Sequence, residues 1–130
     1  IVNLIKKINP QIKIFNTRYI IKNFNKFNLK KKYIIFSGIG NPHSFKTFLK
    51  KNKFNIVDNI VYPDHYKYKE YEIIEIIKKA KSINAQIITT EKDYIKIPKK
   101  YQKKLNYIKI DMEIDQSKNF RKFLKDKINE

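Results

Sequence analysis

The sequence predicts an α/β fold in which a mostly parallel sheet is flanked by helices. Apolar runs of strand length recur along the chain, and segments with apolar residues at helical spacing lie between them. This alternation is typical of parallel strands joined by crossover helices. With 130 residues and no linker rich in Pro, Gly or Ser, the chain is expected to form one domain over residues 1–130.

The first third of the chain is expected to hold two strands and a helix. Partial alternation of apolar residues indicates a strand over Gln11–Tyr19, and the apolar run Tyr33–Phe36 indicates a buried strand. Asn41 suits the N-cap of the helix that follows, and Pro42 suits its first turn. We expect this helix to end at Asn52 with a left-handed residue.

The middle of the chain contains the clearest helix. A strand is expected over Asn55–Tyr62, and after a loop the apolar residues follow helical spacing. They are Ile73, Ile76, Ile77, Ala80 and Ile83. A further strand over Gln86–Thr90 leads into a polar turn or short helix at Glu91–Lys96.

The last third is expected to add one strand and one helix. Tyr107–Ile110 has the composition of a fourth sheet strand. Asn119–Ile128 has the spacing of an amphipathic helix, with Phe120, Phe123 and Leu124 facing inward.

The net charge of +18 suggests a nucleic-acid or anionic-membrane partner. However, only Arg18 and Arg121 of the 30 basic residues are arginine, and phosphate-binding surfaces usually use arginine forks as well as lysines. The abundant Lys, Asn, Ile, Tyr and Phe are all read from A/T-rich codons, so genome composition accounts for much of the charge. A basic module that binds nucleic acid or an anionic membrane without catalysis is the alternative interpretation, although no recognition-helix or aromatic RNA motif is present.

The composition also bears on other classes of site. The chain has no cysteine, which excludes disulfides and thiolate metal sites. The two separated histidines and scattered acidic residues give no metal-ligand spacing, so no metal site is expected. No apolar run approaches the roughly 20 residues that span a bilayer, and no signal-peptide pattern is present.

Three polar segments follow the ends of predicted strands: Ser37–Pro42, Pro63–Tyr66 and Thr89–Asp93. Each by itself is compatible with an ordinary connection. The carboxyl ends of parallel strands meet at one edge of a sheet, where α/β proteins bind ligands, so together the segments predict a site. The expected site residues are Ser37, Gly38, Gly40, Asn41, Asp64, His65, Thr89, Thr90, Glu91, Lys92 and Asp93.

The first segment has two interpretations. Backbone N–H groups near Gly38 and Gly40, at the start of a helix, could contact an anion. Alternatively, both glycines serve a tight turn that needs residues without Cβ. No Gly-Lys-Ser/Thr follows, so this segment is not a Walker A motif.

The second segment holds one of the two histidines. His65 stands next to Asp64, and a histidine beside a carboxylate on such a loop can act as a base or hold one in place. The other histidine, His43, lies early in a helix beside Lys46 and is expected to be solvated.

The third segment offers hydroxyls, carboxylates and an ammonium group in five residues. Thr90 could cap a short helix with Asp93 three residues later, in an acidic variant of the capping box. Contact with a substrate by the residues Thr89 to Asp93 is an equal alternative.

Taken in order and spacing, these segments resemble the tetraacyldisaccharide 4'-kinase family. The matching sequences are FSGIGNP at residues 36–42, YPDHY at residues 62–66 and TTEKDYIK at residues 89–96. The resemblance runs from about Tyr33 to Lys96. This chain departs from the family at Lys69, where a helix-starting Thr or Ser is usual, and near Asn52, where a helix-ending Gly is usual.

The resemblance implies a two-domain P-loop kinase of Gram-negative bacteria, with this chain as its Rossmann-like C-terminal lobe. An N-terminal P-loop domain, absent from this chain, would bind ATP and Mg²⁺. The implied reaction transfers the γ-phosphate of ATP to the 4'-hydroxyl of tetraacyldisaccharide 1-phosphate, giving lipid IVA in lipid A biosynthesis. The active site would lie between the two domains, at the cytoplasmic face of the inner membrane.

The resemblance also implies roles and partners. The family's histidine falls on His65, next to Asp64, and is expected to help deprotonate the acceptor hydroxyl together with an aspartate from the N-terminal domain. The expected partners are the lipid A precursor, an anionic membrane surface and the N-terminal P-loop domain; nucleic acid is not expected. Because the chain begins at Ile1 and lacks a P-loop, we expect a piece of a longer protein that is inactive alone.

Overall fold

The computed structural model describes residues 1–129 and divides into two compact units. Residues 22–109 form one unit, and residues 1–21 with residues 110–129 form the other. The α/β domain expected over residues 1–130 is therefore confined to residues 22–109. The two ends of the chain come together in a unit of their own.

The larger unit is built on a four-stranded sheet in the order β3-β2-β4-β5. All neighbouring strands in it are parallel, as predicted. The strands are β2 (Lys32–Ser37), β3 (Asn55–Val61), β4 (Ala85–Thr90) and β5 (Asn106–Ile108).

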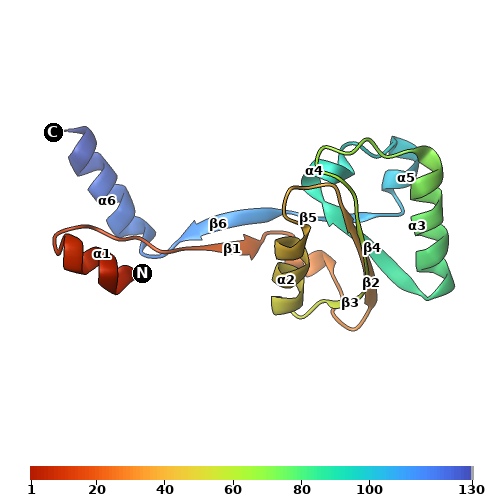
Figure 1. Ribbon diagram of the computed structural model, residues 1–130, viewed down its shortest axis with the longest axis horizontal. Helices are drawn as coiled ribbons and strands as arrows, with labels where there is room; N and C mark the ends of the chain where they lie inside the picture. Colours follow the sequence, from red (N-terminus) through yellow and green to blue (C-terminus); the bar gives the residue numbers. More distant parts are fainter. Residues whose placement is uncertain (130) are drawn as a thin grey trace. The chain divides into compact units, whose positions relative to one another are not determined.

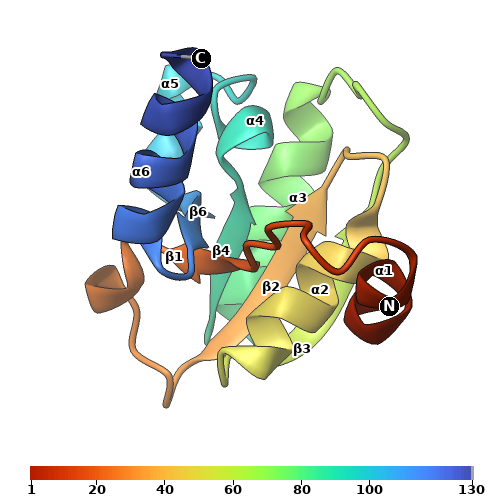
Figure 2. The same ribbon diagram turned by 90° about the vertical axis from the view of Figure 1, so that its left-hand side faces the viewer.

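Helices cover both faces of this sheet. Figures 1 and 2 show α2 on one face and α3 on the other. The helices of this unit are η1 (Phe24–Lys26), α2 (Pro42–Lys51), α3 (Glu70–Ser82), α4 (Glu91–Tyr94) and α5 (Lys99–Gln102). Among the described residues, no helix has both the length and the apolar character to cross a bilayer.

The central strand β2 is apolar because it is buried on both faces. Successive side chains of a strand point to opposite faces, and Tyr33, Ile34, Ile35 and Phe36 are all fully buried. Ile34 and Phe36 pack against α3 in a cluster that also contains Ile73. On the other face, the Phe54 ring packs against Phe24 and Phe27. Its centroid lies 5.4 Å from that of the Tyr33 ring.

The helix ends follow from specific hydrogen bonds. Asn41 caps α2 as predicted, because its Oδ1 accepts the N–H of Ser44 at 3.0 Å. The predicted left-handed stop at Asn52 is wrong: Asn52 has a φ of −85°, and Lys53 is the left-handed residue.

The α3 helix starts without a capping side chain at Lys69. The backbone N–H of Lys69 donates to Oε2 of Glu72 at 2.8 Å, so a residue inside the helix takes over part of the capping. At the other end, Ile83 lies beyond the helix and is 37% exposed, so it does not extend the apolar stripe.

The predicted strand Tyr107–Ile110 divides at Lys109 between two sheets. The side chain of Asn23 accepts the N–H of Lys109 at 2.9 Å and donates to the carbonyl of Tyr107 at 2.8 Å. These bonds satisfy two backbone groups at the point where β5 ends.

The smaller unit consists of two helices and a two-stranded antiparallel sheet. Its elements are α1 (Val2–Ile8), β1 (Thr17–Ile21), β6 (Ile110–Ile114) and α6 (Ser117–Ile128). The strand expected from Gln11 begins only at Thr17, and it pairs with β6 instead of joining the parallel sheet. Arg18 and Glu113 form an ion pair at 2.9 Å across the two strands.

The α6 helix confirms part of its predicted packing. The ring of Phe15 lies 5.0 Å from that of Phe120 and 5.6 Å from that of Phe123. Leu124, expected to face inward, is 41% exposed. That prediction is therefore wrong.

Replacement of Ile73 by Ala tests the core beneath α3. Ile73 is fully buried, so Ile73→Ala should lower the free energy of unfolding by about 2–5 kcal/mol. Urea denaturation of the chain followed by circular dichroism measures this. Ile95→Ala is the control, since Ile95 is 72% exposed and should change stability by no more than about 0.5 kcal/mol. Equal losses in both variants would contradict the described packing.

Candidate functional site

Three loops meet at the carboxyl edge of the parallel sheet, as the sequence predicts. We call them the glycine loop (residues 38–41), the histidine loop (residues 63–69) and the acidic turn (residues 90–96). The carbonyl of Gly38 accepts the N–H of His65 at 3.2 Å, which joins the first two loops. The N–H of Gly38 donates to Oδ2 of Asp93 at 3.0 Å, which joins the first and third.

The imidazole of His65 is exposed at this edge. Its side chain is 77% exposed, and its Nε2 lies 3.7 Å from Oδ2 of Asp64. That separation is longer than a hydrogen bond. The backbone is fixed more tightly than the ring, because the N–H of His65 also donates to Oδ1 of Asp64 at 2.9 Å. His65 has a φ of 59°, in the left-handed region.

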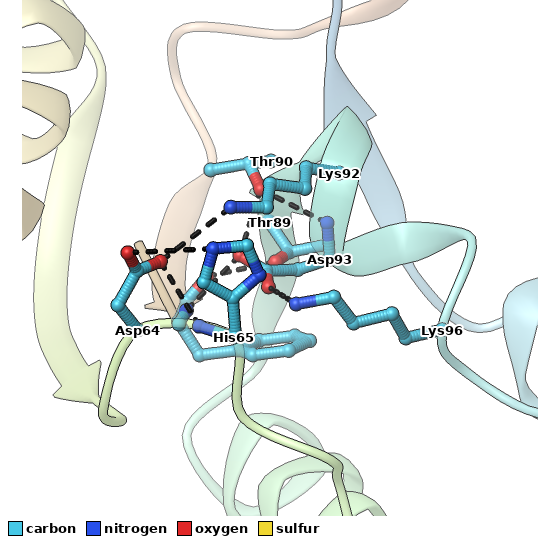
Figure 3. Close-up of polar contacts among 9 residues, drawn as sticks. Asp64, His65, Thr89, Thr90, Lys92, Asp93 and Lys96 are labelled. Atoms are coloured by element: carbon cyan, nitrogen blue, oxygen red, sulfur yellow. Dashed lines mark hydrogen bonds and ion pairs between the residues drawn. The ribbon is translucent and has the colours of Figure 1, made fainter. Parts of the chain in front are cut away.

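Asp64 lies between two positive or potentially positive groups. Its Oδ1 is 3.5 Å from Nζ of Lys92, which connects the histidine loop to the acidic turn (Figure 3). Partial desolvation raises the pKa of Asp64, but the N–H of His65 and the charges of His65 and Lys92 outweigh it. The net pKa of Asp64 lies below its usual value. This carboxylate is therefore ionised at neutral pH.

Asp93, expected to line a cleft, is completely buried. Its Oδ2 accepts from Gly38 and from Oγ1 of Thr90 at 2.7 Å, and its Oδ1 lies 3.0 Å from Nζ of Lys96 (Figure 3). Burial raises the pKa of Asp93, but these donors, together with Tyr68, hold it below its usual value. Asp93 is thus a buried charge that holds loops together.

Two other predicted site residues are also fully buried. Thr89 donates its hydroxyl to the carbonyl of Phe36 at 2.8 Å, which links β4 to β2. Ser37 is 0% exposed, and its Oγ has no hydrogen-bond partner among the described residues. Both lie behind the edge and not on its surface.

Thr90 confirms its predicted role as a cap. Its Oγ1 accepts the N–H of Asp93 at 3.1 Å while its hydroxyl donates to the Asp93 carboxylate. Glu91 and Lys92 follow it and are exposed. Of the acidic turn, these two residues can reach a ligand directly.

The two glycines have different reasons to be glycine. Neither has a positive φ. A Cβ on Gly38 would lie 3.0 Å from the carbonyl oxygen of Pro63 and 3.2 Å from Cβ of Tyr66, whereas the nearest atom to a Cβ on Gly40 is 3.6 Å away, on Asp64. Close packing of the histidine loop therefore excludes a side chain at Gly38 but not at Gly40. Gly40 and Asn41 are exposed at the rim.

Sequence reasoning missed the aromatic support of the histidine loop. The rings of Tyr62 and Tyr66 stack at 4.8 Å, and the Tyr66 hydroxyl donates to Oε1 of Glu72 at 2.8 Å. Tyr68 packs edge-on against Phe36 at 5.3 Å, and burial with the nearby Asp93 charge raises its pKa. The sequence does contain a signal for this support, since Tyr62, Tyr66 and Tyr68 lie on either side of His65 at a spacing of two or four residues.

The residues present do not form a metal site. Within residues 1–129, no group of three or more His, Cys, Asp or Glu side chains is placed to hold an ion.

Comparison with known proteins places the chain in a family. The family described as tetraacyldisaccharide-1-P 4'-kinase, LpxK, matches residues 5–129. The chain is 44% identical to the tetraacyldisaccharide 4'-kinase of Pelagibacter ubique over 115 residues, covering 88% of this chain and 37% of that protein. It is 38% identical to the enzyme of the same name from Rickettsia typhi over 91 residues, covering 69% of this chain and 28% of that protein.

The chain thus spans about a third of the length of these relatives. Its fold is similar to a crystal structure of LpxK from Aquifex aeolicus in complex with ATP. The TM-score is 0.56 at 18% sequence identity, over 92% of this chain and 39% of that one. The match over residues 5–129 shows that the chain belongs to the tetraacyldisaccharide-1-P 4'-kinase family.

Proposed function

We propose that this chain is the C-terminal, histidine-bearing part of a kinase that makes lipid IVA. The reaction would transfer the γ-phosphate of ATP to the 4'-hydroxyl of tetraacyldisaccharide 1-phosphate. Membership of the family supports the reaction. The observation that carries the role of this chain is the exposed imidazole of His65 at the edge where three loops converge.

In this proposal His65 accepts the proton of the acceptor hydroxyl. The 4'-oxygen forms a bond to the γ-phosphorus as the bond from that phosphorus to the bridging oxygen of ADP breaks. The imidazole takes the hydroxyl proton, and the ionised Asp64 stabilises the charge that the ring acquires. Lys92 offers a positive charge beside the same loop for an anionic group of either substrate.

ATP needs residues that this chain does not contain. Its sequence has no Gly-Lys-Ser/Thr after a glycine loop, so the phosphate-binding residues are assigned to an N-terminal P-loop domain of a longer protein. That domain is the proposed partner of the edge that bears His65. Mg²⁺, which neutralises charge during such transfers, is assigned to the same domain.

Removal of the His65 imidazole tests this proposal in a chimera. The chimera replaces the 115 matched residues of the Pelagibacter ubique kinase with those of this chain. His65→Ala should lower kcat by about 100- to 10,000-fold, because the acceptor hydroxyl loses its base. Phosphate transfer from radiolabelled ATP to the tetraacyldisaccharide acceptor measures the rate.

His43→Ala is the matched control, since His43 is the chain's other histidine and is exposed. It should leave kcat within about twofold, because His43 is an exposed side chain with no proposed role in the reaction. Near-normal turnover of the His65→Ala chimera, or an inactive chimera with native His65, would refute the proposed function.

The proposed location is the cytoplasmic face of the inner membrane, where the lipid acceptor resides. The net charge of +18 supports contact with an anionic surface, at about 1 kcal/mol for each lysine near the headgroups. The chain should therefore float with vesicles containing an anionic phospholipid at low salt and dissociate at high salt. Equal flotation with purely zwitterionic vesicles, or none with anionic ones, would count against this surface.

A further inference from the structure

We propose that Asp93 is a positioning residue for His65, acting through the backbone of Gly38. This inference rests on the proposed function of His65. The sequence suggested Asp93 as a residue that contacts substrate, whereas its side chain is 0% exposed. Its contacts instead lead to the histidine loop in two steps.

The first step is the position of Asp93, in α4 directly after strand β4. The chain passes from β2 outward to β3 and then returns to the other side of β2 with β4. Such a reversal leaves a crevice between the carboxyl ends of the two strands, which open α/β folds use for ligands. Here Asp93 Oδ2 accepts the N–H of Gly38 at 3.0 Å and so bridges the loops that follow β2 and β4.

The second step runs through Gly38. The N–H of this residue is held by Asp93, and its carbonyl oxygen accepts the N–H of His65 at 3.2 Å. A charged acceptor makes the first bond about twice as strong as a neutral one. Because both bonds are made by the same residue, the carboxylate fixes the backbone of Gly38 and with it the carbonyl oxygen that accepts from His65.

Packing makes the connection stiff. A Cβ on Gly38 would come within 3.0 Å of the Pro63 carbonyl oxygen and 3.2 Å of Tyr66 Cβ. The histidine loop therefore rests on the backbone of Gly38 on both sides of His65. A displacement of Gly38 moves that loop with it.

The remaining donors fix the Asp93 carboxylate in one orientation. Thr90 donates to Oδ2 at 2.7 Å, and the Lys96 ammonium lies 3.0 Å from Oδ1. Asparagine has the same shape but only one acceptor oxygen. In Asp93→Asn the amide group must face either the Lys96 ammonium or the Gly38 N–H, so the bridge to Gly38 weakens without a change in volume.

Nuclear magnetic resonance of the chain tests the connection without any kinase assay. The chain has two glycines and two histidines, so samples labelled with ¹⁵N-glycine and ¹⁵N-histidine give two backbone amide signals each. Asp93→Asn should move the Gly38 amide proton upfield, because the charged acceptor is lost, and should also shift the His65 amide. Gly40 and His43 are internal controls that should move less.

Two outcomes would overturn the proposal in this measurement. One is a Gly38 signal that does not move, and the other is a His65 signal that stays in place while Gly38 moves. Should Asp93→Asn fail to fold, Thr90→Val replaces it, since it removes one donor to Oδ2. The same pattern with smaller shifts is then expected, and unmoved Gly38 and His65 signals again refute the proposal.

A steric pair of variants provides a second test of the same path. Gly38→Ala should shift the His65 amide, because the new Cβ would push the histidine loop outward. Gly40→Ala is the matched control, since its Cβ would meet nothing closer than 3.6 Å. Equal effects of the two variants on His65 would contradict the steric argument.

A double-mutant cycle in the chimera then tests the consequence for the reaction. Misplacement by about 1 Å can cost up to about 100-fold, so Asp93→Asn should lower kcat by about 10- to 100-fold with little change in the KM for ATP. In a His65→Ala background, Asp93→Asn should cost almost nothing more, because its effect passes through the missing imidazole. Losses that multiply would refute the positioning role. If His65→Ala itself has no effect, the proposed function fails, while the amide shifts still decide whether Asp93 controls the loop.

Discussion

The buried carboxylate of Asp93 is the constraint on which the edge of the sheet depends. A charge removed from water costs several kcal/mol unless it is paired and hydrogen-bonded. Asp93 recovers that cost from the Gly38 N–H, the Thr90 hydroxyl and the Lys96 ammonium. Because these donors come from two loops, the carboxylate is satisfied only when the loops that follow β2 and β4 are held together. Loss of one partner of such a buried group typically costs about 3–5 kcal/mol, so the loops have one strongly favoured arrangement.

This constraint separates the predicted site residues into a frame and a surface, with the half-buried cap Thr90 between them. Ser37, Gly38, Thr89 and Asp93 are buried and connect the central strands to their loops. The exposed set consists of Gly40, Asn41, Asp64, His65, Glu91 and Lys92. The exposed set holds the His65 imidazole and the Lys92 ammonium group. The frame residues carry no substrate chemistry, yet they decide where the exposed groups lie.

The parallel sheet and its loops could be predicted because each depends on local pattern. The apolar run at β2 and the helical spacing of α3 required no knowledge of distant residues, and the rule for carboxyl ends then gathered the loops. The pairing of β1 with β6 could not be found in this way. Arg18 and Glu113 are 95 residues apart, so no local pattern links the two strands. The burial of Asp93 was equally hidden, because an aspartate after a capping threonine is usually exposed.

The two glycines show why motif and conformation must be considered separately. The sequence suggests a tight turn that needs the conformational freedom of both glycines, but neither has a positive φ. In these loops the left-handed residue is His65. That conformation costs a non-glycine residue about 1–2 kcal/mol. At His65 the cost is offset by two acceptors of its N–H, the carbonyl of Gly38 and Oδ1 of Asp64. The surroundings therefore impose the backbone of His65 against its own preference. The result is an imidazole that is 77% exposed on a loop whose backbone is fixed by hydrogen bonds.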